Sequence, residues 1–539
     1  MAGKKKKRKK KNRSVRIDAD GQMHLFADKE AMKGRQRADR QGGSEGRSVQ
    51  FCTGRPERIL ICSQSLEDFL TEREHSEAFR VSEFLHKQDW SLFVKKYKGG
   101  GRPPYDPAAM VGLILFGIMQ GRSSLRELEA LGQFDSRAWW LTGGLCPDHS
   151  KIGRFINEHG EALSQEFFES ATRQVLAQAG GGKGDAAMDG TVVQAAASAY
   201  RNIKQEAARQ RAAEARQQAE KDPQDEKAQQ KAELAELVAE TADRRVEARR
   251  KRGKDTSQTR VSPTEPEAAV LRHKNRSVSP AYKPSVLADE NRIILAHAVH
   301  PTSEAKVVGG MLDQAKRAGA KIRRVLADGL YYDSEVLAAC KEKGKQLVCP
   351  PRKDKKTGLF PKSMFCYNRW TDRWLCPGGH EMAPVNRTRN RDKGMVTYGK
   401  APCGECPHRK LCTKNQKGRQ ITRYEDDGDK EALCRFMKTE EAKERYGHRA
   451  GMVEPVYSTL KDRQGLRRFR RRGLEKVRLE FALHAIAYNL KRYLVFTAPG
   501  AASGNDPLSE VGDAVCRLFL RLTAIFPWPA RPRLAAYSS

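Results

Sequence analysis

The chain has 539 residues, and its 101 Lys and Arg side chains outnumber its 67 Asp and Glu side chains, giving a net charge of +34. Such an excess favours nucleic acid as a partner, because cations that neutralise phosphates release counterions. The alternative is a merely basic protein. No stretch reaches the roughly 18 to 20 apolar residues that a membrane span needs, so a membrane protein is not expected.

The basic start of the chain, Lys4 to Lys11, is followed by no apolar segment, so it does not predict a secretory signal. A reducing compartment is therefore expected, in which the 12 cysteines are thiols and metal ligands rather than disulfides. Residues 1–55 are rich in Lys, Arg, Gly and Ser and are predicted to be a disordered tail. This tail either adds non-specific DNA affinity or only keeps the chain in solution.

Residues 56–178 are predicted to form a helical domain. One helix is expected from Asp106 to Met119, with Pro107 in its first turn, and another after a Ser cap at Ser123-Ser124.

The segment Pro147–Gly160 places Ile152, Phe155 and Ile156 on one helical face, with Lys151, Arg154 and Asn157 on another. It is interpreted as the recognition helix of a helix-turn-helix that binds DNA through Lys151 and Arg154. The alternative is a purely structural or dimerising helix.

An α/β pattern begins at Gly180. A short apolar strand ends at Asp189-Gly190, and a second ends at Asp328-Gly329. Between them the sequence predicts a hairpin that turns at residues 289–291 and a helix over residues 303–318.

The segment 203–252 has few large apolar residues and predicts an exposed helical hairpin or partial disorder. Its basic end either contacts DNA or is a solvated face.

Cysteines cluster in the following part of the chain, which we assign to an insertion over residues 341–440. Thiolates two residues apart in a Gly- or Pro-containing turn can chelate one tetrahedral ion, and a further pair can complete the site. We predict a structural Zn²⁺ site, with His380 or His408 as substitute ligands; an iron–sulfur cluster or unbound thiols are the alternatives. The predicted ligands are Cys376, Cys403, Cys406 and Cys412.

A single carboxylate, Glu454, lies among cations between Tyr446 and Lys461. Pro455 predicts that Glu454 lies at or near the start of a helix, with Lys461 on nearly the same face two turns later. Aspartates at the ends of central strands and a glutamate from a later helix can converge and bind divalent cations through oxygen.

These residues resemble the DDE transposases of bacterial insertion sequences, which have an RNase H-like catalytic core. The matching segments are Met-Asp189-Gly-Thr-Val-Val-Gln-Ala, Ala-Asp328-Gly-Leu-Tyr-Tyr-Asp-Ser-Glu and Val-Glu454-Pro-Val-Tyr, and the similarity covers roughly residues 104–493. The family signature is Tyr, two residues, Arg, three residues, Glu, six residues, Lys. In this chain four residues, rather than three, separate Arg449 from Glu454.

The resemblance implies an α/β RNase H-like core, a mixed sheet flanked by helices, built from residues 180–340 and 441–496. It implies Mg²⁺ or Mn²⁺ at a two-metal site of Asp189, Asp328 and Glu454. The partners would be double-stranded DNA, as terminal inverted repeats and target, and a second copy of the chain. The location would be the bacterial cytoplasm, at the nucleoid. Phosphate contacts are expected from Arg449, Lys461, Arg467, Arg468, Arg470, Arg471 and Arg472.

The resulting hypothesis is a transposase that cleaves DNA at the ends of an insertion sequence and transfers the strand to target DNA. Two alternatives stay open: a non-catalytic DNA-binding protein derived from a transposase, and a metal-dependent nuclease without strand transfer. Residues 497–539 form a tail to which the sequence assigns no function.

Overall fold

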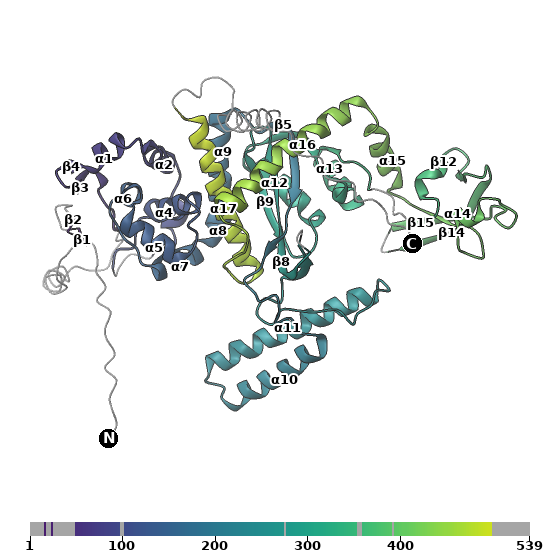
Figure 1. Cartoon of the computed structure of the whole chain (residues 1–539), viewed down its shortest axis with the longest axis horizontal. Coiled ribbons are helices and arrows are strands. Elements are labelled where there is room, and N and C mark those ends of the chain that lie inside the picture. Colours follow the sequence, from purple (N-terminus) through teal and green to yellow (C-terminus); the bar gives the residue numbers. More distant parts are fainter. Residues whose placement is uncertain are drawn as a thin grey trace, which may run out of the picture.

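The computed structural model describes residues 16–17, 23–24, 49–97, 102–273, 276–352, 358–390 and 393–498. Of the predicted N-terminal tail it describes only the paired strands β1 (Arg16–Ile17) and β2 (Met23–His24) and the residues from 49 onward. The rest of that prediction, and almost all of the C-terminal tail, lie outside the described residues. Figure 1 shows a helical domain, a central sheet with its helices, a projecting arm and a small β-rich module.

The helical domain confirms the predicted helices. Asp106 caps α4 (Pro107–Met119), and Ser124 and Glu127 form a capping box at the start of α5 (Leu125–Phe134). The other elements are η2 (Pro56–Arg58), β3 (Leu60–Ile61), β4 (Gln64–Ser65), α1 (Leu66–Glu72), α2 (Ser76–His86), α3 (Ser91–Val94), α6 (Ser136–Thr142), α7 (His149–Glu158), α8 (Gly160–Ala162), the π-helix η3 (Leu163–Phe167) and α9 (Phe168–Ala179).

A mixed sheet forms the centre of the molecule, and its strands run in the order β11-β10-β5-β8, with β9 paired to the other edge of β8. β10 and β11 are parallel to β5, and β8 runs antiparallel to both β5 and β9. The bounds are β5 (Lys183–Gly190), β8 (Val278–Asp289), β9 (Ile294–His300), β10 (Lys321–Leu326) and β11 (Gln346–Val348).

The chain order around this sheet agrees with the prediction. The hairpin β8–β9 turns at residues 290–293, and η4 (Ala305–Val307) and α12 (Val308–Arg317) precede β10. After β10 come η5 (Gly329–Tyr331), α13 (Ser334–Glu342) and β11, so residues 346–348 belong to the central sheet. Two short strands, β6 (Val193–Gln194) and β7 (Ala269–Arg272), pair with the first half of β8.

The helix α17 (Leu474–Phe496) joins the helical domain to the sheet. It packs against α9, β9 and α4, and most of its side chains are buried around its whole circumference. A helix that is covered on all sides belongs to the interior of a protein. No helix in the described part of the chain is long and apolar enough to cross a membrane.

Asn489 fastens α17 to its neighbours. Its Nδ2 donates to Thr172 Oγ1 at 3.0 Å and to the Ile294 carbonyl at 2.8 Å, and its Oδ1 accepts from the Ile294 amide at 2.9 Å. Replacing Asn489 by Ala leaves three buried polar groups without partners, so we expect a loss of about 3 kcal/mol in the free energy of unfolding. Thermal unfolding measures it; Lys476→Ala, an exposed change on the same helix, is the control. Equal melting temperatures for both variants would contradict the expectation.

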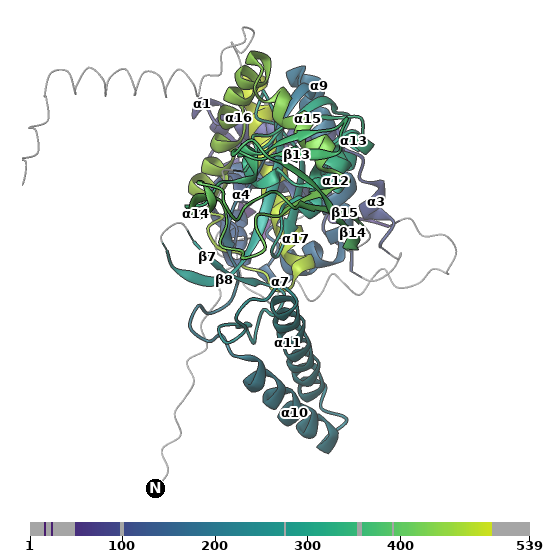
Figure 2. The same ribbon diagram turned by 90° about the vertical axis from the view of Figure 1, so that its right-hand side faces the viewer.

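The segment 203–252 forms the predicted helical hairpin. It consists of α10 (Gln205–Lys221) and α11 (Glu226–Arg250), which pack on each other and project from the core (Figures 1 and 2). Arg245 anchors its base by donating to the carbonyls of Pro266 at 2.7 Å and Ala268 at 2.9 Å.

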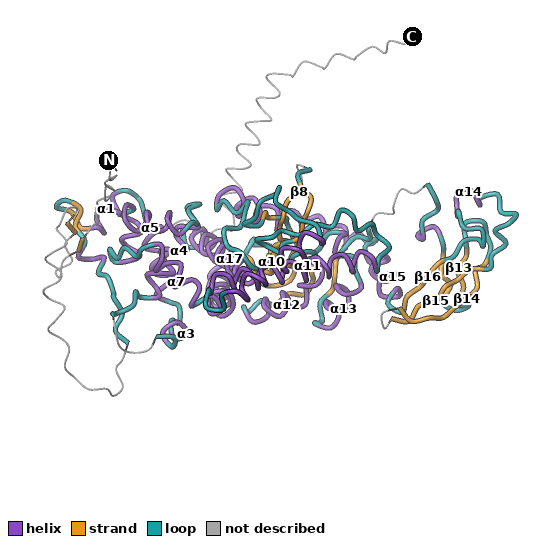
Figure 3. Tube along the Cα trace, turned by 90° about the horizontal axis from the view of Figure 1, so that it is seen from below, coloured by secondary structure: helices purple, strands orange, loops and turns teal. Residues whose placement is uncertain are grey.

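The cysteine-rich segment is a five-stranded antiparallel sheet, at the opposite end of the molecule from the helical domain (Figure 3). Phe365, Trp374, Met382, Tyr398 and Ile421 form a small core with Cys412. The elements are η6 (Lys362–Met364), β12 (Cys366–Asn368), β13 (Arg373–Leu375), β14 (Glu381–Asn390), β15 (Lys393–Gly399), α14 (Arg409–Cys412) and β16 (Ile421–Tyr424), followed by α15 (Asp427–Phe436).

Candidate functional site

Asp189 and Asp328 lie side by side at one end of the central sheet. β5 and β10 are parallel neighbours in which Ala187 is opposite Leu326. Asp189 lies two residues after Ala187, and Asp328 lies two residues after Leu326. Asp328 also caps η5 by accepting from the Leu330 amide at 2.8 Å. The parallel register therefore brings together two carboxylates that are 139 positions apart in the sequence, as the difference between their numbers shows.

Like charges gather around Asp189. Burial raises the pKa of Asp189 above its ordinary value, and the carboxylates of Asp328 and Glu304 raise it further, while Arg449 opposes the shift. Arg449 Nη2 lies 2.9 Å from Asp189 Oδ1. Partly buried carboxylates that repel one another fit a divalent cation, which neutralises them and prefers oxygen ligands.

Glu304 explains the glycine that follows Asp189. An added Cβ at Gly190 would lie 2.4 Å from the Glu304 Cδ atom, so the carboxyl group of Glu304 occupies the space that a side chain would need. Lys283 Nζ pairs with Glu304 at 3.0 Å. Sequence analysis missed Glu304, because its only signal is its position shortly after β9.

Glu454 lies in α16 (Glu440–Ser458), and its side chain is exposed. α16 packs against β5, β8, β10 and β11. One turn after Glu454, Tyr457 Oη donates to the Asp189 carbonyl at 2.7 Å. Tyr457 was missed by the sequence analysis, although it follows Glu454 at the i+3 spacing that shares a helical face.

The prediction that Pro455 places Glu454 at the start of a helix is wrong, because Pro455 lies inside α16, close to its C-terminal end. A proline in a helix removes the hydrogen bond to the carbonyl four residues earlier. Here that carbonyl belongs to Gly451, and Arg292 Nε donates to it at 3.2 Å. A guanidinium from the β8–β9 turn therefore replaces the missing amide.

Lys461 lies in the π-helix η7 (Thr459–Arg463) that continues α16, and its Nζ donates to Thr191 Oγ1, two residues after Asp189. The structure therefore brings Asp189, Asp328, Arg449 and Lys461 to one region. Within the described ranges, no group of three or more His, Cys, Asp or Glu side chains is arranged to hold a metal ion.

The arginine run, Arg467 to Arg472, leads from this region to the helical domain. Arg468 donates to the carbonyls of Ala195 and Ala197 at 3.1 and 3.0 Å, and Arg472 donates to that of Ala196 at 3.2 Å. These carbonyls belong to the segment after β6. Arg467 is exposed and pairs with Asp462.

The other end of the run contacts the helical domain. Arg471 Nη1 donates to Asn157 Oδ1 on α7 at 2.8 Å, and Arg470 Nη2 lies 3.6 Å from Glu127 Oε2 on α5. On α7 itself, Ile152, Phe155 and Ile156 are buried, as predicted. Lys151 and Arg154 are exposed.

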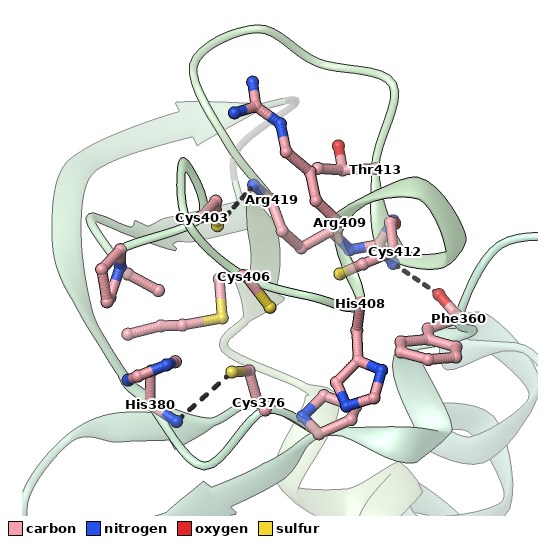
Figure 4. A pocket seen from close by; sticks show the side chains of 15 residues that line it. Phe360, Cys376, His380, Cys403, Cys406, His408, Arg409, Cys412, Thr413 and Arg419 are labelled. Carbon is pink, nitrogen blue, oxygen red and sulfur yellow. Dashed lines mark hydrogen bonds between the residues drawn. The ribbon is translucent and has the colours of Figure 1, made fainter.

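Four cysteines line one small cavity of about 20 Å³ in the β-rich module, and Figure 4 shows their thiols pointing towards its middle. The amide of His380 donates to Cys376 Sγ and that of Arg419 to Cys403 Sγ, both at 3.4 Å. Amide donors to sulfur stabilise thiolates, which are the ligands that a soft divalent ion prefers. The residue types therefore fit such an ion, although the four thiols do not form an arranged metal-binding group in this structure. Burial raises the pKa of Cys412, and the neighbouring thiols add to that shift while Arg419 opposes it.

Two parts of the chain match transposase domain families. Residues 375–494 match the family described as "Transposase DDE domain", and residues 64–158 match the "Transposase domain (DUF772)". These two domains support a function in DNA transposition, and the DDE domain implies an RNase H-like core. The comparison with curated proteins finds no match.

The two matches cover different parts of the molecule. The DDE match contains the four cysteines, Glu454 and nearly all of α17, and the other match contains α7 with Lys151 and Arg154. Asp189 and Asp328 precede the DDE match, so their assignment depends on the sequence motifs and on the register between β5 and β10.

Proposed function

We propose that the chain cleaves DNA at the ends of an insertion sequence and joins the freed strand to target DNA. The observation that carries this proposal is the pairing of β5 with β10, which puts Asp189 beside Asp328 under α16, the helix of Glu454. Both steps are displacements at phosphorus, so one site serves both. A water first attacks a phosphodiester at the element end, and the bond to the 3′-oxygen breaks, giving a 3′-hydroxyl and a 5′-phosphate. The 3′-hydroxyl then attacks a phosphodiester of the target, from which the target's own 3′-oxygen leaves.

Asp189, Asp328 and Glu454 would hold Mg²⁺ or Mn²⁺ ions. When bound, such ions activate the attacking oxygen and stabilise the leaving oxygen of an in-line displacement. In the structure Arg449 balances the charge of Asp189, and its buried Nε has no hydrogen-bond partner in the described part of the chain. Arg449 Nη2, which pairs with Asp189, would bind a phosphate oxygen when a cation binds Asp189 in its place.

The cations of the chain suggest how DNA is held. α7 would read the DNA end through Lys151 and Arg154, and the arginine run would hold phosphates between α7 and the aspartates. Lys461 would contact the phosphate nearest Asp189. Two copies of the chain would hold the two ends of one element together, and Cys376, Cys403, Cys406 and Cys412 would hold a structural Zn²⁺.

Metal-dependent cleavage tests the proposal. The purified chain is incubated with a labelled duplex that carries the end of the flanking element, in Mg²⁺, Mn²⁺ or EDTA. We expect cleavage at the element boundary in either metal, and none in EDTA or with Glu454→Ala, because that variant lacks one of the three carboxylates.

Each outcome of this assay separates the alternatives. Binding without cleavage in both metals would favour a DNA-binding protein derived from a transposase. Cleavage without joining of an exposed 3′ end to a second duplex would favour a nuclease. Wild-type cleavage by Glu454→Ala would remove Glu454 from the site.

A further inference from the structure

The backbone amides of the loop from Arg470 to Leu474 donate to three glutamates that the proposed reaction does not use. Glu480 accepts from the Arg470 amide at 3.0 and 3.1 Å and from the Arg471 amide at 2.9 Å. Glu265 accepts from the Gly473 amide at 2.7 Å, and Glu267 from the Leu474 amide at 2.6 Å. Four of five consecutive residues thus donate their amides to carboxylates.

Two of these carboxylates are buried. Glu480 is 7% exposed and Glu265 is 1% exposed, and Glu265 also accepts from Tyr282 Oη at 2.5 Å. A buried carboxylate costs several kcal/mol unless hydrogen bonds compensate it. For Glu480 the compensation comes from the loop amides, and for Glu265 it comes from the Gly473 amide and Tyr282 Oη at Oε1, while the buried Oε2 has no hydrogen-bond partner in the described part of the chain. The position of the loop and the burial of the charges therefore depend on each other.

The side chains of this loop line a cleft, in which Arg470 and Arg472 are exposed, Arg471 is half-buried, and Glu480 is also part of the lining. Arg470, Arg471 and Arg472 line this cleft of about 600 Å³ between the helical domain and the core, together with Lys476, Ser124 and Asn157. One wall of this cleft belongs to the segment 195–197 that follows β6, and the other to α5 and α7.

We propose that Glu480 and Glu265 are positioning residues that preform the loop as a clamp for DNA phosphates between α7 and Asp189. The inference rests on the proposed function, since DNA is the partner. Phosphate fits the clamp because three guanidiniums line one cleft, and fixing them in advance removes their ordering cost on binding.

For this clamp, the expected change in DNA affinity on removal of a carboxylate is opposite in sign to the change that simple electrostatics predicts. Removing an acidic charge from a DNA-binding surface normally raises affinity for a polyanion. Glu480→Gln removes one charge but also removes an acceptor for the amides of Arg470 and Arg471. We therefore expect this variant to bind DNA about tenfold more weakly than the wild type.

The experiment measures DNA affinity against salt concentration, in EDTA, with a duplex of mixed sequence. Because each phosphate contact adds about 0.9 to the slope of log K against log salt, loss of two contacts flattens that slope by about 2. Glu475→Gln is the matched control: Glu475 is exposed in the first turn of α17 and pairs with Arg478. This control should bind DNA slightly more tightly than the wild type.

A double-mutant cycle separates positioning from general instability. In an Arg470→Ala, Arg471→Ala background, Glu480→Gln should weaken binding by less than twofold, because the side chains that it positions are gone. Glu265→Gln should act in the same direction as Glu480→Gln. Full additivity in the cycle, or tighter binding by Glu480→Gln as in the control, would overturn the inference. Because EDTA prevents cleavage, failure of the proposed reaction would not alter this result.

Discussion

Replacing Asp189 or Asp328 by Asn is expected to abolish DNA cleavage and to leave DNA binding in place. Asn keeps the shape of the side chain but not its charge, and charge is what makes two adjacent carboxylates a cation site. We expect the cleavage rate to fall by roughly a thousandfold, because electrostatic stabilisation is usually the largest contribution to such catalysis. Binding is expected to persist because the arginine run and α7 are unchanged.

A nearby aspartate provides the control for these variants. Asp333 lies five residues after Asp328 and caps α13 by accepting from the Glu335 amide at 3.0 Å. Asn caps helices about as well as Asp, so Asp333→Asn should cut DNA at the wild-type rate. Cleavage by either of the other two variants at the rate of this control would contradict the assignment of the aspartate pair.

The sequence predicted the central sheet because local signals there agree with the fold. The strands that end at Asp189 and Asp328 are short apolar runs, and the β8–β9 hairpin has a polar turn between two apolar segments. The parallel register of β5 and β10 is different, since the contact joins distant segments and has no local signature. The strand ends indicated that Asp189 and Asp328 can converge, and the resemblance assigned them to one metal site. The parallel register that places them side by side came only from the structure.

Pro455 shows where a local rule failed. The rule that proline does not occur deep in a helix concerns one missing hydrogen bond, and a side chain distant in sequence can replace it. Arg292 does so at the Gly451 carbonyl. The glutamates under the arginine loop were missed for a similar reason, since nothing in the sequence indicates that Glu265 and Glu480 face the same loop.

The cysteine module was predicted from its thiols alone. Its strands β12 and β13 have only three residues each, too few for alternation to show, and the apolar side chains that form its core are scattered from Phe365 to Ile421. The prediction of the ligand residues used only spacing in the chain. The cavity that they line needed the fold of β12 to β16 as well.

Removal of zinc is expected to unfold this module, and Cys403→Ser and Cys406→Ser are expected to prevent its folding. The core there is small, and structural Zn²⁺ contributes roughly 10–16 kcal/mol of apparent binding free energy in comparable small modules. The purified chain should contain one zinc per copy by elemental analysis. Chelation should make residues 359–426 sensitive to protease while the central sheet stays resistant.

Cys366→Ser is the matched control, because Cys366 is an exposed thiol on β12 of the same module and does not line the cavity. It should keep its zinc and its resistance to protease. If Cys403→Ser and Cys406→Ser kept the same zinc content as this control, the four cysteines would not be the ligands. If the wild type lacked zinc and its module still resisted protease, the small apolar core alone would hold the five strands together, and the amide donors to Cys376 and Cys403 would be hydrogen bonds to ordinary thiols.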